Sequence, residues 1–200
     1  HECPAITARR ARRAQALGQA DDDPIVWASA VGANVVDVDG NRFVDLTSGF
    51  GVAFVGHRHP AVVAAATDQA GTLIHAMGDA WPDASRIALL DRLAAVCPGD
   101  LGVSILGLSG ADAVDAAVKT AVLATGRTGV LAFEGGYHGL SLGTVALQGY
   151  KPAFTEPFRG IAHPRVQHLP WGAPVEQVAA ALAGGDVGLV LAEPIQGRGG

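Results

Sequence analysis

From residue 103 onward the sequence alternates short apolar runs with longer segments of helical pattern. The apolar runs have the length of buried strands, and Gly126 is placed to close the first helix. This alternation predicts an α/β fold with a mainly parallel, doubly wound sheet flanked by helices, which binds ligands at the carboxyl ends of its strands. The predicted elements are strand 103–108, helix 111–125, strand 130–133, helix 175–182 and strand 187–192.

The residues before this alternation predict a small α+β element. Two β-rich runs flank Asp39-Gly40, and this pattern predicts a β-hairpin with a type I′ turn. A glycine-rich connection follows over 48–60. It contains His57 and His59, which have no nearby third ligand, so we expect turn histidines and no metal site. Near the start, blocks of arginine and aspartate of opposite sign over 9–23 predict a solvated helix.

Two helices are predicted between these regions, one from residue 61 toward 75 and one from about 83 to 96. We therefore expect two domains: a helix and hairpin segment over 1–60, and the first part of a larger domain over 61–200.

Composition narrows the classes of function. Hydrophobic residues make up 49% of the 200 residues and charged residues 16%, which predicts a folded core. No apolar run approaches the roughly 18 residues of a membrane span, so no membrane partner is expected. The formal net charge of −5 argues against general nucleic-acid binding. Two cysteines, Cys3 and Cys97, fit a reducing, cytoplasmic compartment.

The segment Leu108-Ser109-Gly110-Ala111-Asp112 joins a predicted strand to a predicted helix through small residues. Ser109 is expected to cap the helix, with Asp112 in capping-box register. Open N–H groups and the helix dipole favour an anion at such a helix start. An ordinary tight turn has the same pattern, so both interpretations stay open on this segment alone.

Two later strand ends carry further candidate residues. Tyr137 follows Glu134-Gly-Gly after a strand, where its ring can stack on a planar ligand or cover an edge of the core. Glu193, fixed by Pro194 after the last strand, projects into the same crevice or is solvated.

The stretch Gly139-Leu-Ser141-Leu-Gly143 matches the Gly-x-Ser-x-Gly elbow of serine hydrolases. The elbow requires a strand that leads directly into the serine, whereas several loop residues intervene here. A triad would have to combine Glu156 with His163 or His168. A serine hydrolase that uses Ser141 is therefore the weaker alternative.

Taken together, these segments resemble the class III, ω-amino-acid type, pyridoxal-phosphate-dependent aminotransferases of fold type I. The resemblance covers nearly the whole chain after about residue 34. Several motifs in one order are more specific than any of them alone. The motifs are Val38-Asp39-Gly40-Asn41-Arg-Phe-Val-Asp-Leu46, Ser48-Gly-Phe-Gly-Val52, Gly56-His-Arg-His-Pro60, Ser109 to Lys119, Tyr137-His-Gly139 and Glu193-Pro-Ile-Gln-Gly197.

The resemblance implies pyridoxal 5'-phosphate as cofactor, bound in a large sheet domain of a homodimer whose active sites lie between subunits. Its cofactor-binding residues would be Ser109, Gly110, Ala111, Tyr137, His138 and Glu193. Of these, the first three would hold the phosphate, Tyr137 would stack on the pyridine ring, and Glu193 would lie in the inner part of the pocket.

For the substrate, the resemblance points to Phe50 and Arg198. Arg198 stands where many ω-aminotransferases carry an acid that pairs with a carboxylate-binding arginine, and Asp112 stands where the family usually has Glu. The implied reaction moves an amino group between an amine or amino acid and a 2-keto acid. The donor and acceptor stay open, as do decarboxylation, racemisation and aminomutase chemistry on the same scaffold.

The family's ring-nitrogen aspartate and Schiff-base lysine follow the Glu-Pro-x-Gln-Gly motif, beyond Gly200. Lys119 and Lys151 match neither position. We therefore expect no catalytic residue within this chain, which would be the N-terminal portion of an enzyme and inactive alone. A truncated, non-catalytic chain that only dimerises or binds a partner is the other alternative.

Overall fold

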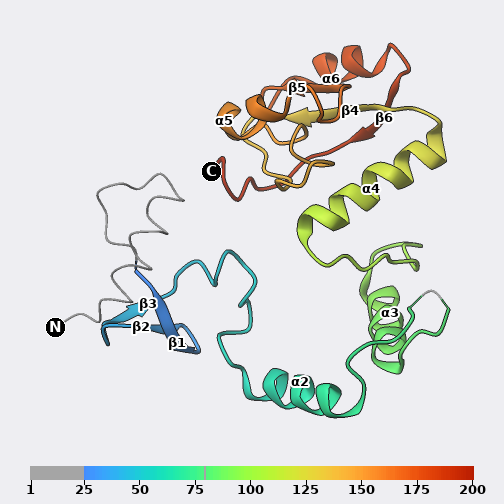
Figure 1. The fold of residues 1–200 in the computed structure, drawn as a ribbon. Coiled ribbons are helices and arrows are strands. Elements are labelled where there is room, and N and C mark those ends of the chain that lie inside the picture. The colour runs from blue at the N-terminus through green and yellow to red at the C-terminus, as the bar shows by residue number, and fades with distance from the viewer. Residues whose placement is uncertain (1–24, 79) are drawn as a thin grey trace. The chain divides into compact units, whose positions relative to one another are not determined.

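The computed structural model describes residues 25–78 and 80–200, and the helix predicted over 9–23 lies outside them. The chain divides into two compact units, His1–Ala84 and Ser85–Gly200, and each is described by itself (Figure 1). The domain boundary predicted at residue 60 stays a prediction.

The first unit contains a three-stranded antiparallel sheet. Its strands are β1 (Trp27–Val31), β2 (Asn34–Asp37) and β3 (Arg42–Val44), in the order β1-β2-β3. Strands β2 and β3 form the predicted hairpin, with Val35 opposite Phe43. Val35 is fully buried, so the core of this small unit lies at the central strand.

The turn of this hairpin differs from the prediction. A type I′ turn needs positive φ at both central residues, but only Gly40 has it, at 86°. The carboxylate of Asp37 shapes the turn instead: it accepts the backbone N–H groups of Asp39 and Asn41 at 2.9 and 2.8 Å, and the Asn41 amide at 2.9 Å. The hydrogen bonds that the Asp37 carboxylate accepts from its own turn therefore stabilise the hairpin without a second residue of positive φ.

The two predicted helices of the middle region are present as α2 (Pro60–Thr72) and α3 (Ala84–Val96). Neither helix buries a residue. Within residues 25–78 and 80–200, no helix is long and apolar enough to cross a membrane.

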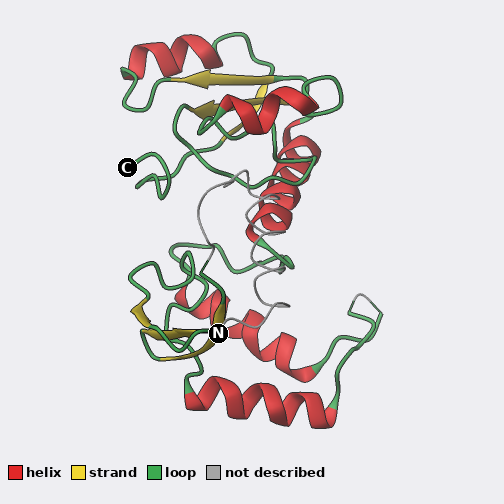
Figure 2. Ribbon diagram, turned by 60° about the vertical axis from the view of Figure 1, so that its left-hand side comes forward, coloured by secondary structure: helices red, strands yellow, loops and turns green. Residues whose placement is uncertain are grey.

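The second unit is built on a parallel sheet with the order β5-β4-β6. The strands are β4 (Gly129–Phe133), β5 (Val166–Leu169) and β6 (Val187–Val190), and the helices are α4 (Gly110–Thr125), α5 (Pro152–Thr155), the 3-10 turn η1 (Glu156–Phe158) and α6 (Val175–Leu182). Both views show α4 and α6 on opposite sides of this sheet (Figure 1 and Figure 2). The predicted α/β architecture is confirmed, and β4 is a switch point, because the chain leaves it toward one neighbour and returns on its other side.

The strand predicted over 103–108 is wrong. These residues form no strand, and Val103 and Leu108 are 94% and 100% exposed. A strand needs a hydrogen-bonded neighbour. Both edges of β4 are taken by β5 and β6, and residues 103–108 pair with neither outer strand, although each of those strands keeps one edge that no described strand occupies.

The core of the second unit joins α4 to the sheet through Val118, Val130 and Leu147. Leu147 belongs to the loop after β4, and its neighbours Thr144 and Val145 are buried as well. This loop is therefore part of the core, and it carries the residues that follow β4 to a fixed place.

Gly126 ends α4 in the left-handed conformation, with φ of 66°, and donates its N–H to Val122 O at 2.8 Å. A Cβ there would meet no atom within 4 Å, so only the backbone conformation opposes a side chain. We expect Gly126→Ala to lower the free energy of unfolding by about 1 kcal/mol, and Gly126→Asn by less, because Asn tolerates this conformation. Urea denaturation followed by circular dichroism measures the order; equal stability of all three proteins would contradict this cap.

Candidate functional site

Helix α4 begins at a side-chain cap. Ser109 has extended backbone, and its Oγ accepts the N–H of Asp112 at 3.2 Å, as predicted. Asp112 Oδ2 accepts the N–H of Leu108 at 2.9 Å, one residue earlier than in a standard capping box. These two hydrogen bonds satisfy the N–H groups of Asp112 and Leu108. The N–H groups of Gly110 and Ala111 remain open, because the first turn of a helix gives them no acceptor. A Cβ on Gly110 would meet nothing within 4 Å, so the space beside this helix start is open.

The loop after β4 packs against this helix start. Gly139 has φ of 110°, and a Cβ there would lie 2.6 Å from Ala111 Cβ and 3.0 Å from Thr144 Oγ1. Only glycine permits this approach. The structure thus brings Ala111 and the segment that contains Tyr137 together, as the predicted site requires.

Glu193 joins the ends of β4 and β6. Its Oε1 accepts the backbone N–H of Tyr137 at 2.6 Å, and its Oε2 accepts that of Gly197 at 3.0 Å. Gln196, only 6% exposed, donates its Nε2 to Glu134 O at 2.7 Å. The turn after β6 therefore holds the loop after β4 at two points.

The ring of Tyr137 lies beside Arg198. The guanidinium carbon of Arg198 is 4.8 Å from the Tyr137 ring centroid and 5.9 Å from that of Tyr150. These distances are typical of cation–π contacts, which orient a guanidinium without neutralising it. The structure therefore places two of the predicted site residues, Tyr137 and Arg198, side by side.

His138 is buried under the same loop, at 8% exposed. Burial lowers its pKa, with a smaller effect of His168 in the same direction, and Glu193 opposes both. Its Nε2 has no hydrogen-bond partner among the described residues and lies near Gly136, where a Cβ would be 2.9 Å away. Burial therefore disfavours the charged form of His138, and one ring nitrogen stays unsatisfied at the inner side of the loop.

Neither lysine is arranged as a nucleophile. Lys119 pairs with Asp115 at 2.5 Å, and the hydrogen bond from that pair raises its pKa. An amine nucleophile needs a lowered pKa. Lys151 is exposed, with Nζ 5.1 Å from the Tyr150 ring centroid.

The hydrolase elbow at Ser141 is not supported. Strand β4 ends at Phe133, and Ser141 lies in a run of turns rather than between a strand and a helix. Its Oγ forms a 3.0 Å hydrogen bond with Thr144 Oγ1. The serine therefore stabilises the buried loop and lacks the geometry that exposes a nucleophile.

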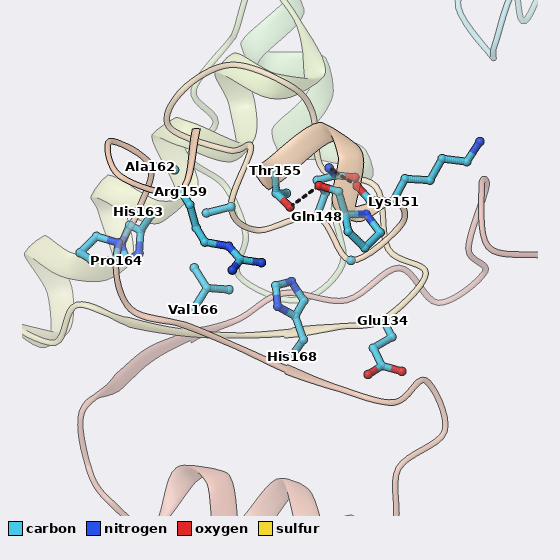
Figure 3. A pocket seen from close by; sticks show the side chains of 13 residues that line it. Glu134, Gln148, Lys151, Thr155, Arg159, Ala162, His163, Pro164, Val166 and His168 are labelled. Carbon is cyan, nitrogen blue, oxygen red and sulfur yellow. Dashed lines mark hydrogen bonds between the residues drawn. The ribbon is translucent and has the colours of Figure 1, made fainter. Parts of the chain in front are cut away.

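A hollow of about 580 Å³ lies beside β5. Figure 3 shows Arg159 and His168 pointing toward one another inside it, while Lys151 points away. None of the residues predicted for the cofactor lines this hollow. We therefore place the candidate site at the start of α4 and the ends of β4 and β6.

Phe50 belongs to the first unit, where it is 80% exposed on a turn of unusual conformation. Asp45, which follows β3, holds this turn by accepting the N–H of Thr47 at 3.0 Å and that of Gly49 at 2.8 Å. His57 Nε2 lies 2.8 Å from the same carboxylate. The described residues contain no group of three or more His, Cys, Asp or Glu that could hold a metal ion.

The roles of Asp45 and Gln196 were not predicted from the sequence. Both stand inside motifs that carried the family resemblance, so the motif positions were the available signal. Their partners are distant in sequence: His57 is 12 residues from Asp45, and Glu134 is 62 residues from Gln196. Local pattern does not show such pairings.

Comparison with known proteins gives one consistent family. The family model described as Aminotransferase class-III matches residues 17–200. The acetylornithine aminotransferase of Methanopyrus kandleri is 38% identical over 179 residues, which cover 88% of this chain and 44% of that enzyme. The 2-aminoadipate transaminase of Pseudomonas putida is 36% identical over 191 residues, which cover 88% of this chain and 46% of that enzyme. The chain thus spans about half the length of these relatives.

Solved structures agree on the fold. An (S)-enantioselective ω-transaminase from Thermomicrobium roseum has a TM-score of 0.85 at 23% identity and covers 96% of this chain and 50% of its own. A taurine:2-oxoglutarate aminotransferase from Bifidobacterium kashiwanohense, solved with PLP (pyridoxal phosphate) and glutamate, has a TM-score of 0.75 at 22% identity, with 87% and 44% covered. The predicted incomplete fold type I architecture is confirmed.

The close approach of Gly139 to Ala111 predicts that a side chain at residue 139 destabilises the protein. A methyl group on Gly139 would overlap the Ala111 methyl and would also strain the backbone at φ of 110°. We expect Gly139→Ala to lower the free energy of unfolding by about 2 kcal/mol. Gly160→Ala is the matched control, because a Cβ there meets nothing within 4 Å. Urea denaturation of both variants measures the difference, and equal stability would show that the loop does not pack on α4.

The lowered pKa of Asp45 predicts that the stability of the first unit depends on pH. Hydrogen bonds, chiefly from His57 and then Thr47, lower its pKa from 3.8 to about 2. Because the folded pKa is the lower one, this stabilisation is complete above about pH 4 and is lost as the pH falls toward 2. We expect Asp45→Asn to remove that part of the acid sensitivity. Urea unfolding at several pH values, followed by the fluorescence of Trp27 in a Trp81→Phe, Trp171→Phe background, measures it; parallel pH profiles would contradict it.

Proposed function

The chain belongs to the class-III aminotransferases, and on that premise we propose that the whole protein is a pyridoxal-phosphate-dependent transaminase. It would move an amino group between an amine or amino acid and a 2-keto acid. A homodimer in the cytoplasm is part of the proposal, which for these two properties rests on the family resemblance and on the small number of cysteines.

The start of α4 fits the phosphate of the cofactor. Two N–H groups remain after the Ser109 cap, the space at Gly110 is open, and the helix dipole adds positive potential there. This open, donor-lined helix start, packed against the loop of Tyr137, is the observation that carries the proposal. When bound, pyridoxal phosphate supplies an electron sink for amino-group transfer.

The loop after β4 would hold the ring of the cofactor. Tyr137 offers an aromatic face, and Glu193 fixes its backbone through the 2.6 Å hydrogen bond. Glu193 thus positions Tyr137 from the inner part of the pocket. His138 Nε2 is a buried polar atom that a ligand group at this loop would satisfy.

Arg198 and Phe50 would contact the substrate. A guanidinium held over two tyrosine rings is suited to a carboxylate, because its planar fork donates two parallel N–H groups to the two carboxylate oxygens. The relatives named for acetylornithine and 2-aminoadipate act on amino acids. We therefore favour an amino acid over a simple amine as donor, with Phe50 against its apolar part.

The experiment compares Gly110→Ala with the parent sequence in the whole protein. A methyl group at Gly110 costs no contact and favours the helix, so stability rises by about 0.5 kcal/mol. The same methyl group occupies the space proposed for the phosphate. We expect the dissociation constant of pyridoxal phosphate, measured by absorbance titration, to rise about tenfold or more, which corresponds to the loss of one hydrogen bond to a charged group.

Amino transfer to 2-oxoglutarate from a panel of amino acids is then measured with the cofactor bound. Lys119→Ala is the control, because Lys119 is paired with Asp115 and should leave both binding and transfer unchanged. Unchanged cofactor affinity in Gly110→Ala would contradict the phosphate site. Binding without any transfer would leave a different reaction on this fold or a non-catalytic protein.

A further inference from the structure

The turn that carries Phe50 has a backbone conformation that is unfavourable for residues with a side chain. Four consecutive residues, Ser48 to Gly51, have positive φ, at 50°, 58°, 58° and 85°. Two of them, Ser48 and Phe50, are not glycines. L-residues avoid this region, and such outliers persist only where the surrounding structure holds them.

The turn's own side chains do not supply that hold by burial. Phe50 is 80% exposed, and Val52 and Phe54 farther along the loop are 90% and 85% exposed. Within the turn, Gly51 N donates to Thr47 O at 3.0 Å and Ala53 N donates to Ser48 O at 2.8 Å. These bonds close the left-handed turn but do not connect it to the sheet.

The connection to the sheet is the carboxylate of Asp45. One oxygen accepts Thr47 N at 3.0 Å and Thr47 Oγ1 at 2.8 Å, and the other accepts Gly49 N at 2.8 Å. The second oxygen also lies 2.8 Å from His57 Nε2. The Asp45 side chain is only 2% exposed, so water hardly competes for these bonds.

His57 is in turn anchored to the sheet. Its N–H donates to Gly32 O at 2.8 Å, and Gly32 N donates to its carbonyl at 2.9 Å, in an antiparallel bridge at the β1–β2 turn. Its ring meets Trp27 of β1 edge to face at 5.8 Å. Asp45 and His57 therefore close the base of the loop over residues 45–57 and tie both of its ends to the sheet.

We propose that Asp45 and His57 are positioning residues for the transaminase reaction: their contact holds the left-handed turn that presents Phe50 to the substrate. The proposal rests on the proposed function only for what Phe50 contacts. The order of the turn itself is independent of that function and is measured separately.

The test uses the whole protein with pyridoxal phosphate bound and three variants. Asp45→Asn removes the charge and one acceptor, His57→Ala removes the donor, and His57→Gln keeps an N–H donor as the conservative replacement. Asp37→Asn is the matched control, because the Asp37 carboxylate also accepts the N–H groups of a turn in the same sheet, and these groups belong to Asp39 and Asn41, outside the 45–57 loop.

The first measurement is amide hydrogen exchange of the 47–53 segment. We expect about tenfold faster exchange or more in Asp45→Asn and His57→Ala, a smaller change in His57→Gln and none in Asp37→Asn. The second is steady-state kinetics, in which the KM of the amino donor rises about tenfold while the dissociation constant of the cofactor stays the same.

Each measurement tests one part of the proposal. Unchanged exchange in Asp45→Asn would overturn the contact as the support of the turn. Faster exchange with an unchanged KM would overturn its role for the substrate and leave it structural. If the parent protein transfers no amino group, the proposed function fails, while the exchange data still decide whether Asp45 and His57 hold the turn.

Discussion

The carboxylate of Glu193 is the contact on which the candidate site depends. Two strands of a parallel sheet end at the same edge, but the loops that follow them are free to diverge. Glu193 accepts one backbone N–H from each loop, Tyr137 on the β4 side and Gly197 on its own side. A carboxylate that accepts two backbone N–H groups is charge-assisted on both oxygens, so the joint resists movement of Tyr137. The close approach of Gly139 to Ala111 then fixes the same loop relative to the start of α4.

The local sequence was sufficient to predict an element where the residues that determine it lie within or next to that element. Helix α4 is predicted within one residue, because Ser109 and Gly126 are specific cap residues and their bonds are local. Strand β4 is predicted for a related reason, since a short apolar run followed by two glycines has few other solutions. The hairpin in the first unit is likewise predicted, although its turn is shaped by the Asp37 carboxylate rather than by a second positive φ.

Local sequence failed where a feature depends on a distant partner. The run 103–108 has the composition of a strand, but a strand forms only with a hydrogen-bonded partner, and this run pairs with none of the described strands. Glu193 was placed in the inner part of the pocket from its motif, yet the bond that it accepts from Tyr137 follows from the path of a loop 56 residues earlier in the chain. The same limit applies to Asp45 and His57, whose pairing closes a loop that composition describes only as glycine-rich.

In the proposed site, the two N–H groups that the Ser109 cap leaves open, those of Gly110 and Ala111, receive the cofactor phosphate. The most direct measurement is the ¹H–¹⁵N spectrum of the whole protein, labelled with ¹⁵N, before and after addition of pyridoxal phosphate. We expect the largest downfield shifts at the amides of Gly110 and Ala111, and smaller ones at Leu108 and Asp112, whose N–H groups are already bonded. Bound cofactor with its largest amide shifts elsewhere, and none at Gly110 or Ala111, would rule out a phosphate site at the start of α4.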